Sequence, residues 1–203
     1  MIKWFLPITI ALSFGLSLAQ AAGNPEEGKT QSAICAGCHG ADGNSPLNPL
    51  WPKIAGQHPA YIEKQIKDFK TGDRTDQTMA PMAMPLNDQQ IADLAAYYAG
   101  QTRQIGEAAA DMVAAGEALY RGGNPETGVA ACMACHGPAG SGNPQANFPA
   151  VAGQHAAYTE KALKDFRDGN RTNDASKMMQ GVVARMSDAE MAAVAQYIQG
   201  LSR

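Results

Sequence analysis

Apolar residues recur at helical spacing, with polar residues between them, in four stretches of the chain. The stripes consist of Tyr61, Ile62, Ile66 and Phe69; Ile91, Leu94, Ala95 and Tyr98; Tyr158, Leu163 and Phe166; and Met191, Val194, Ala195 and Ile198. Gly72 and Gly169 follow the first and third stripes, and glycine commonly follows the last turn of a helix. The pattern predicts an all-α fold in which the tyrosines and methionines of the stripes lie in the core rather than against a cofactor.

Polar residues mark the expected starts of two of these helices. Asn87 with Gln90, and Ser187 with Glu190, have the spacing of a capping box, in which each residue's side chain accepts from the other's backbone N–H. The serine and glutamate pair is the closer match to the motif. We expect helices to begin directly after Asn87 and Ser187.

The chain repeats itself. Residues 51–61 match residues 148–158 at an offset of 97 positions, and the match resumes at an offset of 100 between Tyr97 and Tyr197. The change of three positions places a small insertion in the intervening loop of the second copy. Two copies are too few for a solenoid. We therefore predict a tandem duplication, with an N-terminal domain at residues 22–103 and a C-terminal domain at residues 104–203.

All four cysteines lie in two Cys-x-x-Cys-His motifs, which are also 97 positions apart. This motif is typical of covalent c-type haem attachment, with the histidine as an axial iron ligand. The spacing is just under one helical turn, so both sulfurs lie on one face. We predict two covalently bound haem c groups, held through Cys35, Cys38, Cys132 and Cys135, with His39 and His136 as metal ligands.

Three other readings of the cysteine pairs are weaker. A thioredoxin-like redox pair requires a βαβ context, and no convincing strand pattern lies near either motif. A zinc site that joins both pairs would span 97 residues, against roughly 12–20 in ordinary zinc modules. A disulfide framework would not explain why histidine directly follows each pair.

The N-terminus has the pattern of a secretory signal. Lys3 precedes an apolar run from Trp4 to Leu18, and Ala19-Gln20-Ala21 matches a small-x-small cleavage site. The run is 15 residues long, against roughly 20 for a bilayer span. We expect residues 1–21 to be a signal peptide and the mature chain to be exported. An uncleaved signal would instead tether the protein to the membrane.

Charge is balanced between the two halves. Residues 24–105 contain 7 basic and 9 acidic side chains, and residues 106–203 contain 8 and 10. Neither half has a basic run suited to a phosphate backbone, so nucleic-acid binding is disfavoured. The mildly acidic surface suits a basic partner but is equally that of an ordinary soluble protein.

The second axial ligand decides what each haem can do, because a vacant position permits chemistry and a closed one favours electron transfer. Met79 and Met179 correspond at the offset of 100, and we predict these two thioethers as axial ligands, with Met82 and Met178 as the next candidates. A thioether ligand raises the reduction potential. Three further methionines fit a gap-filling role in the core better: Met84, Met186 and Met191.

Two further histidines are alternative axial ligands. His58 and His155 correspond in the repeat and would give bis-histidine haems of lower potential. Each follows a Gly-Gln pair at the expected start of a helix. We interpret both as loop or helix-start residues.

The repeated motifs, CxxCH, W/F-P-x-I/V-A-G-Q-H, DF-x-x-G-x-R-T and Y-x-x-G, resemble those of the dihaem cytochrome c4 family over essentially the whole mature chain. The resemblance implies two class I cytochrome c-like domains about a pseudo-two-fold axis, with haem propionates facing the domain interface. It implies that Pro52 and Pro149 pack beside the haems, with their carbonyls accepting from the proximal imidazoles. Arg74 and Arg171 would lie near the propionates or the interface, or else be solvated loop residues.

The resemblance also implies a periplasmic electron carrier, often associated with the membrane. We expect a monomeric dihaem cytochrome that takes single electrons from a respiratory donor complex and passes them to a terminal cytochrome c oxidase. A dihaem peroxidase is the alternative from the enzyme class, and it would need one vacant distal position. A haem subunit of a larger oxidoreductase is the third hypothesis.

Overall fold

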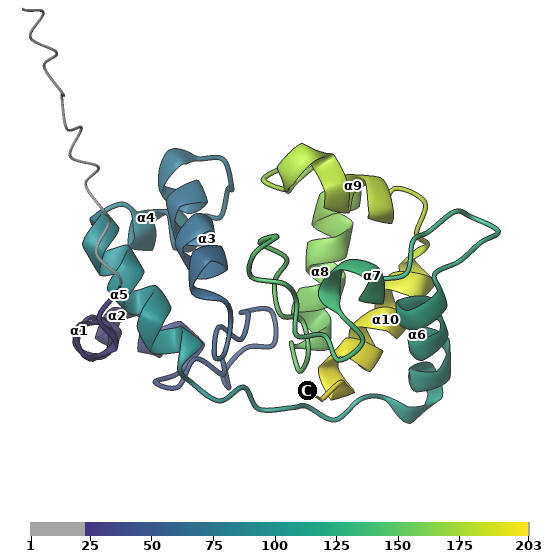
Figure 1. Ribbon diagram of the computed structural model, residues 1–203, viewed down its shortest axis with the longest axis horizontal. Coiled ribbons are helices and arrows are strands. Elements are labelled where there is room, and N and C mark those ends of the chain that lie inside the picture. The colour runs from purple at the N-terminus through teal and green to yellow at the C-terminus, as the bar shows by residue number, and fades with distance from the viewer. Residues whose placement is uncertain (1–22, 203) are drawn as a thin grey trace, which may run out of the picture.

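The computed structural model describes residues 23–202, and the regular elements within that range are helical (Figure 1). The predicted signal peptide at residues 1–21 lies outside the described residues. Helices of the first half are α1 (Pro25–Gln31), α2 (Ala33–His39), α3 (Pro59–Thr71), α4 (Met79–Ala83) and α5 (Asp88–Ala99). Those of the second half are α6 (Ala110–Gly122), α7 (Met133–His136), α8 (Ala156–Arg167), the 3-10 turn η1 (Ala175–Lys177), α9 (Met178–Val183) and α10 (Asp188–Gly200).

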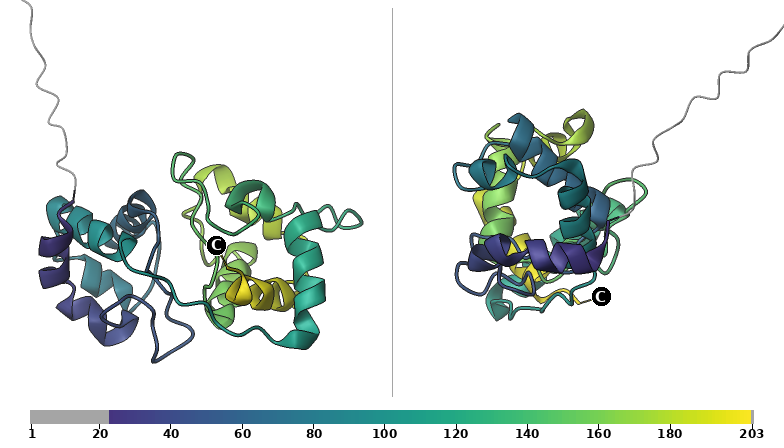
Figure 2. Two further views of the ribbon diagram at one scale, coloured as in Figure 1. Left: turned by 60° about the horizontal axis from the view of Figure 1, so that its bottom comes forward. Right: turned by 90° about the vertical axis from the view of Figure 1, so that its left-hand side faces the viewer.

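The helices form two groups that repeat one arrangement. In the first group α5 packs against α1 and α3, and α4 lies on α3; in the second α10 packs against α6 and α8, and α9 lies on α8. Residues 102–109 have no regular structure and connect the groups along one side of the molecule (Figure 2). The all-α fold and the tandem duplication predicted from the sequence are confirmed.

A glycine permits the closest helix crossing in each group. A Cβ atom on Gly28 in α1 would lie 2.0 Å from the carbonyl oxygen of Asp93 in α5. A Cβ atom on Gly116 in α6 would lie 2.2 Å from the carbonyl oxygen of Ala193 in α10. Both distances are impossible for real atoms, so any side chain at these positions would push the paired helices apart.

Both predicted capping boxes are present. Asn87 Oδ1 accepts from the Gln90 N–H at 2.9 Å, and Gln90 Oε1 accepts from the Asn87 N–H at 3.0 Å. Glu190 Oε2 accepts from the Ser187 N–H at 2.8 Å, and Ser187 Oγ accepts from the Glu190 N–H at 3.3 Å. These bonds satisfy N–H groups that the first turn leaves unpaired, and they set the starts of α5 and α10.

The stripe prediction holds for the C-terminal helices and fails for two tyrosines. Tyr98 and Met191 are 1% and 0% exposed in the cores of their domains. Tyr61 and Tyr158 are only half-buried, and each hydroxyl accepts a hydrogen bond from an arginine of the other domain. Helical spacing identifies the face of the helix on which a tyrosine lies. It does not show that this face also contacts a second domain.

Among the methionines expected to fill the core, Met186 is buried with Met191. The same expectation is wrong for Met84, which is 59% exposed. Met84 caps the C-terminus of the five-residue helix α4, directly before Pro85. The next helix begins only at Asp88, so the Met84 side chain stands outside the packed face.

Two glutamines join the domains in a symmetric way. Gln154 Oε1 accepts from the Lys53 N–H and Gln154 Nε2 donates to the Lys53 carbonyl, both at 2.8 Å. Gln57 makes the same two bonds with the backbone of Ala150, both at 2.9 Å. Both glutamine side chains are 7% exposed. Each amide therefore pairs with a backbone unit of the other domain as a neighbouring strand would.

Candidate haem sites

The first attachment motif lies on α2, which carries both thiols and the imidazole on a single short helix. Cys35 and Cys38 are half-buried free thiols one turn apart, and His39, at the last position of the helix, is 7% exposed. The His39 Nδ1 donates to the carbonyl oxygen of Pro52 at 3.0 Å. This bond fixes the tautomer and leaves Nε2 without a proton, as the predicted iron ligand requires.

The second motif repeats the arrangement on α7. Cys132 is the N-cap of this helix and His136 is its last residue. The His136 Nδ1 donates to the carbonyl oxygen of Pro149 at 2.9 Å. The hydrogen bonds that the resemblance implied for Pro52 and Pro149 are therefore observed, while their packing against haem stays a prediction.

Burial shifts the pKa values of corresponding residues alike in the two motifs. It lowers the pKa of His39 and of His136, against the opposing effect of the proline carbonyls. It raises the pKa of the Cys35 thiol, and that of the Cys132 thiol to about 11. The imidazoles are thus held neutral, as a metal ligand must be. Two thiols and a neutral, oriented imidazole on one face fit covalent haem.

The methionine candidates lie on the short helices α4 and α9. Met79 and Met179 are half-buried, and Met179 packs against the core of its domain. The alternatives Met82 and Met178 are each 41% exposed. Burial therefore favours the repeat-matched pair, and we retain Met79 and Met179 as the proposed axial ligands.

Aspartates fix the starts of these two helices. Asp76 Oδ1 accepts from the Met79 N–H at 2.9 Å, and Asp174 Oδ2 accepts from the Gln180 N–H at 3.0 Å. The three extra residues of the second copy lie in this loop, where Ser176 and Lys177 have φ values of 54° and 55°. The insertion thus changes the loop path, while an aspartate still anchors the methionine-bearing helix.

The alternative histidine ligands are engaged elsewhere. His58 and His155 are the N-caps of α3 and α8. The His58 Nε2 donates to the Ser141 carbonyl at 2.8 Å, and the His155 Nε2 donates to the Ser45 carbonyl at 3.0 Å. Both bonds cross the domain interface. They support the interpretation of these histidines as helix-start residues.

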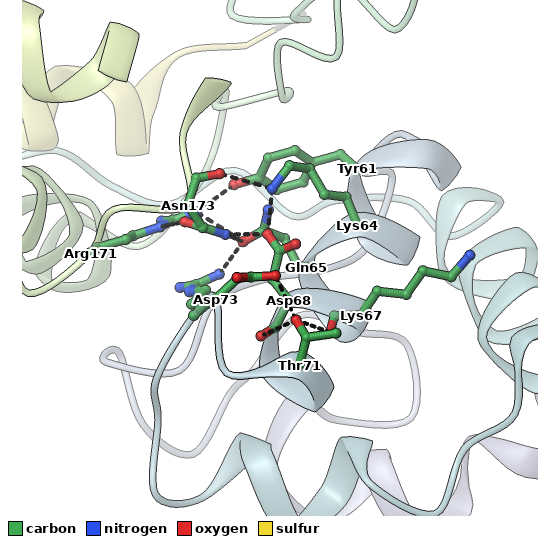
Figure 3. A network of polar contacts seen from close by, with 10 residues as sticks. Tyr61, Lys64, Gln65, Lys67, Asp68, Thr71, Asp73, Arg171 and Asn173 are labelled. Carbon is green, nitrogen blue, oxygen red and sulfur yellow. Dashed lines mark hydrogen bonds and ion pairs between the residues drawn. The ribbon is translucent and has the colours of Figure 1, made fainter. Parts of the chain in front are cut away.

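Arg74 and Arg171 lie at the interface. Arg171 is 7% exposed and donates to Tyr61 Oη and to Gln65 Oε1 of the first domain, both at 3.0 Å (Figure 3). Arg74 donates to Tyr158 Oη of the second domain at 3.1 Å. The two guanidinium groups also lie 4.6 and 4.4 Å from the ring centroids of the phenylalanines in their own domains. The solvated-loop alternative is therefore wrong.

Residues that sequence reasoning did not single out hold the interface together. Arg103, in the connection, is 9% exposed and donates to the Ala55 carbonyl of one domain and to the Ala150 and Ala152 carbonyls of the other. Gln57 and Gln154 stand in the repeated Gly-Gln-His segment. Their repetition at matched positions was the available signal in the sequence, and the structure adds that both side chains are buried.

Comparison with known proteins agrees with this geometry. The family model described as cytochrome c matches residues 25–100 and 113–202. Cytochrome c4 of Thiocapsa roseopersicina is 54% identical over 187 residues, which cover 91% of this chain and 96% of that protein. The crystal structure of reduced recombinant cytochrome c4 from Pseudomonas stutzeri has a TM-score of 0.86 and 46% identity, with 89% of this chain and all of that chain covered.

The chain belongs to the cytochrome c4 family. It is accordingly a dihaem c-type cytochrome with two tandem cytochrome c domains, and its cofactors are two covalently bound haem c groups. Its general function is electron transfer. Membership of this family rules out a thioredoxin-like redox pair, a zinc site and a disulfide framework as explanations of the cysteine pairs.

A more distant relative is named for a specific electron donor. The thiosulfate dehydrogenase electron acceptor of Thiomonas intermedia is 38% identical over 193 residues, which cover 93% of this chain and 85% of that protein.

Within residues 23–202, no helix is both long and apolar enough to cross a membrane.

Proposed function

We propose that this cytochrome is a periplasmic carrier that moves single electrons from a respiratory donor complex to a terminal cytochrome c oxidase. Each haem supplies a one-electron ferric/ferrous couple when bound. The observation that carries the proposal is that each segment that accepts the hydrogen bond of a proximal histidine is also bonded to the other domain. Pro52 accepts from His39, and the next residue, Lys53, is paired with Gln154 of the other domain.

The second domain makes the equivalent contacts with the first. Pro149 accepts from His136, and the next residue, Ala150, is paired with Gln57. Buried glutamine amides thus hold the two segments that orient the proximal histidines in a fixed position relative to the other domain. A rigid scaffold of this kind suits a carrier, because an oxidation-state change then requires little rearrangement around either site.

The remaining parts of the proposal concern each domain and the whole chain. We infer that residues 22–103 and 104–203 each hold one haem, with the iron closed by Met79 in the first and by Met179 in the second. A closed iron disfavours the dihaem peroxidase alternative. Residues 1–21 would direct export, and the mature protein would be a monomer in the periplasm, peripheral to the membrane.

A second donor deserves a direct test, because the Thiomonas relative is a thiosulfate dehydrogenase electron acceptor. In this alternative the chain receives electrons from such a dehydrogenase instead of a respiratory complex. The chemistry at the haems would be unchanged. Only the docking partner on the donor side would differ.

The experiment uses the reduced holoprotein and membranes washed free of soluble cytochromes. We expect oxygen consumption that depends on added protein and stops when the oxidase is inhibited. Reduction of the ferric protein is then measured with quinol-reduced membranes and, separately, with thiosulfate and its dehydrogenase. Peroxide turnover by the pure protein would favour the enzyme hypothesis, and co-purification with a membrane complex in fixed ratio would favour the subunit hypothesis.

A further inference from the structure

The two proximal histidines differ in one neighbour. In the first domain the Ser45 hydroxyl donates to the Pro52 carbonyl at 2.6 Å, and its Oγ also lies 3.3 Å from the His39 Nδ1. His39 donates to that same carbonyl at 3.0 Å. The Pro52 oxygen therefore serves two donors, and the imidazole N–H faces two acceptors.

The second domain has no such hydroxyl. The equivalent of Ser45 at the repeat offset is Gly142. The two positions also match in space, because the Ser45 N–H donates to the His39 carbonyl at 2.7 Å and the Gly142 N–H donates to the His136 carbonyl at 2.8 Å. His136 thus has the carbonyl of Pro149 without a competing side chain from this position.

Ser45 holds this place in an unfavourable backbone conformation. Its φ is 49°, in the left-handed region that favours glycine, and Gly142 has a φ of 73°. Its side chain is 1% exposed. The position is clamped by its N–H bond to His39 and by the His155 Nε2, which donates to the Ser45 carbonyl at 3.0 Å from the other domain. The second domain avoids this backbone strain by having glycine at the equivalent position. Backbone strain of this kind is concentrated at functional sites.

We propose that Ser45 is a positioning residue that raises the reduction potential of the first haem through His39. A hydrogen bond from Nδ1 makes an imidazole a more basic ligand, and a more basic ligand favours ferric iron. The Ser45 hydroxyl competes for the Pro52 carbonyl at 2.6 Å, and its own oxygen, at 3.3 Å, is a poorer acceptor for the imidazole N–H than that carbonyl at 3.0 Å. The net effect is a weaker hydrogen bond from Nδ1. His39 becomes the less basic ligand, which favours the ferrous state. The inference rests on haem attachment and is independent of the donor and the oxidase.

Two variants of the full-length holoprotein separate the hydroxyl from the backbone. Ser45→Ala removes the hydroxyl and keeps the strained φ, whereas Ser45→Gly removes the hydroxyl and relieves the strain. Ser141→Ala is the matched control, because Ser141 adjoins Gly142 and contacts the first domain through its backbone carbonyl. Each protein is taken through a redox titration, and NMR signals assigned to each domain report the reduction potential of each haem. The His39 Nδ1–H chemical shift is recorded in the ferrous state.

Both Ser45 variants should move the ferric/ferrous equilibrium of the first haem toward ferric by about threefold, the effect of part of one hydrogen bond. The His39 Nδ1–H signal should shift downfield in both, and the second haem should be unchanged. Ser141→Ala should alter neither haem. The proposal is overturned if Ser45→Ala leaves the first potential and the His39 signal unchanged, if only Ser45→Gly has an effect, or if both haems shift together.

Discussion

At the scale of single residues, the chemistry of the attachment sites was predictable because it is local. Cysteine spacing and the adjacent histidine depend only on one helical turn, so Cys35, Cys38 and His39 could be identified from the motif alone. The partner of His39 could not be derived from spacing, since Pro52 lies 13 positions away and is brought near by the fold. The resemblance supplied that contact, and the structure contains it.

The methionine ligands remain a prediction that substitution can test. Met79→Ala and Met179→Ala should each open one iron and convert one haem to the high-spin state, because alanine offers no sulfur donor. Met82→Ala and Met178→Ala are the matched controls, since both side chains are 41% exposed. Absorption and NMR spectra of the purified variants report the spin state. Low-spin spectra in the first two variants would refute the assignment.

Tyr158 should titrate unusually early. Burial alone raises the pKa of this hydroxyl, but the guanidinium groups of Arg74 and Arg171 outweigh it and lower the pKa to about 8. Because this pKa is lower in the folded than in the unfolded state, the stabilisation from tyrosinate is fully present above about pH 10. It is lost as the pH falls through about 8.

The titration can be followed by NMR of ¹³C-labelled tyrosine. A signal with a midpoint near pH 8 should be present in the wild type, absent in Tyr158→Phe and retained in Tyr61→Phe. If every tyrosine titrates near its ordinary value of about 10, the two guanidinium groups do not act on Tyr158 as described.

At the scale of elements, the four helices with apolar stripes were predictable, whereas α1 and α6 and the close contacts that they make were not. Stripes and capping boxes located α5 and α10 because periodicity and capping are properties of neighbouring residues. Gly28 and Gly116 carry no such local signal. Each has its significance only because a second helix, about 70 positions away, presents its backbone at that point.

Gly116→Ala should destabilise the second domain, because the added Cβ would meet the Ala193 carbonyl oxygen at 2.2 Å. The expected loss is about 2–3 kcal/mol in the free energy of unfolding, the usual cost of overpacking. Gly122→Ala in the same helix has open space around the added atom and should be neutral or slightly stabilising. Denaturant unfolding of the holoproteins measures both. Equal stability of the two variants would contradict this account of the helix crossing.

At the scale of the whole molecule, the duplication was visible in the sequence but the interface was not. Matched segments predict two similar domains, yet they do not indicate which surfaces meet. The interface depends on buried or half-buried polar residues that a hydrophobic pattern cannot identify, among them Gln57, Gln154, Arg74, Arg103 and Arg171. Their arrangement only becomes interpretable once both domains are placed together.

Gln154→Ala should loosen the two domains, because it leaves the buried N–H and carbonyl of Lys53 without their amide partner. The expected cost is about 1–3 kcal/mol, and the domains should show more independent tumbling in NMR relaxation. Gln77→Ala is the control, since Gln77 is exposed. Unchanged tumbling in Gln154→Ala would show that these bonds do not hold the interface.

The central claim is that both irons are closed by two protein ligands, which makes the chain a carrier rather than an enzyme. Carbon monoxide binding to the fully reduced, native holoprotein tests it most directly, because only a vacant or readily vacated position admits the gas. We predict no spectral change at either haem at neutral pH. Rapid, stoichiometric binding at one haem or at both would contradict the account.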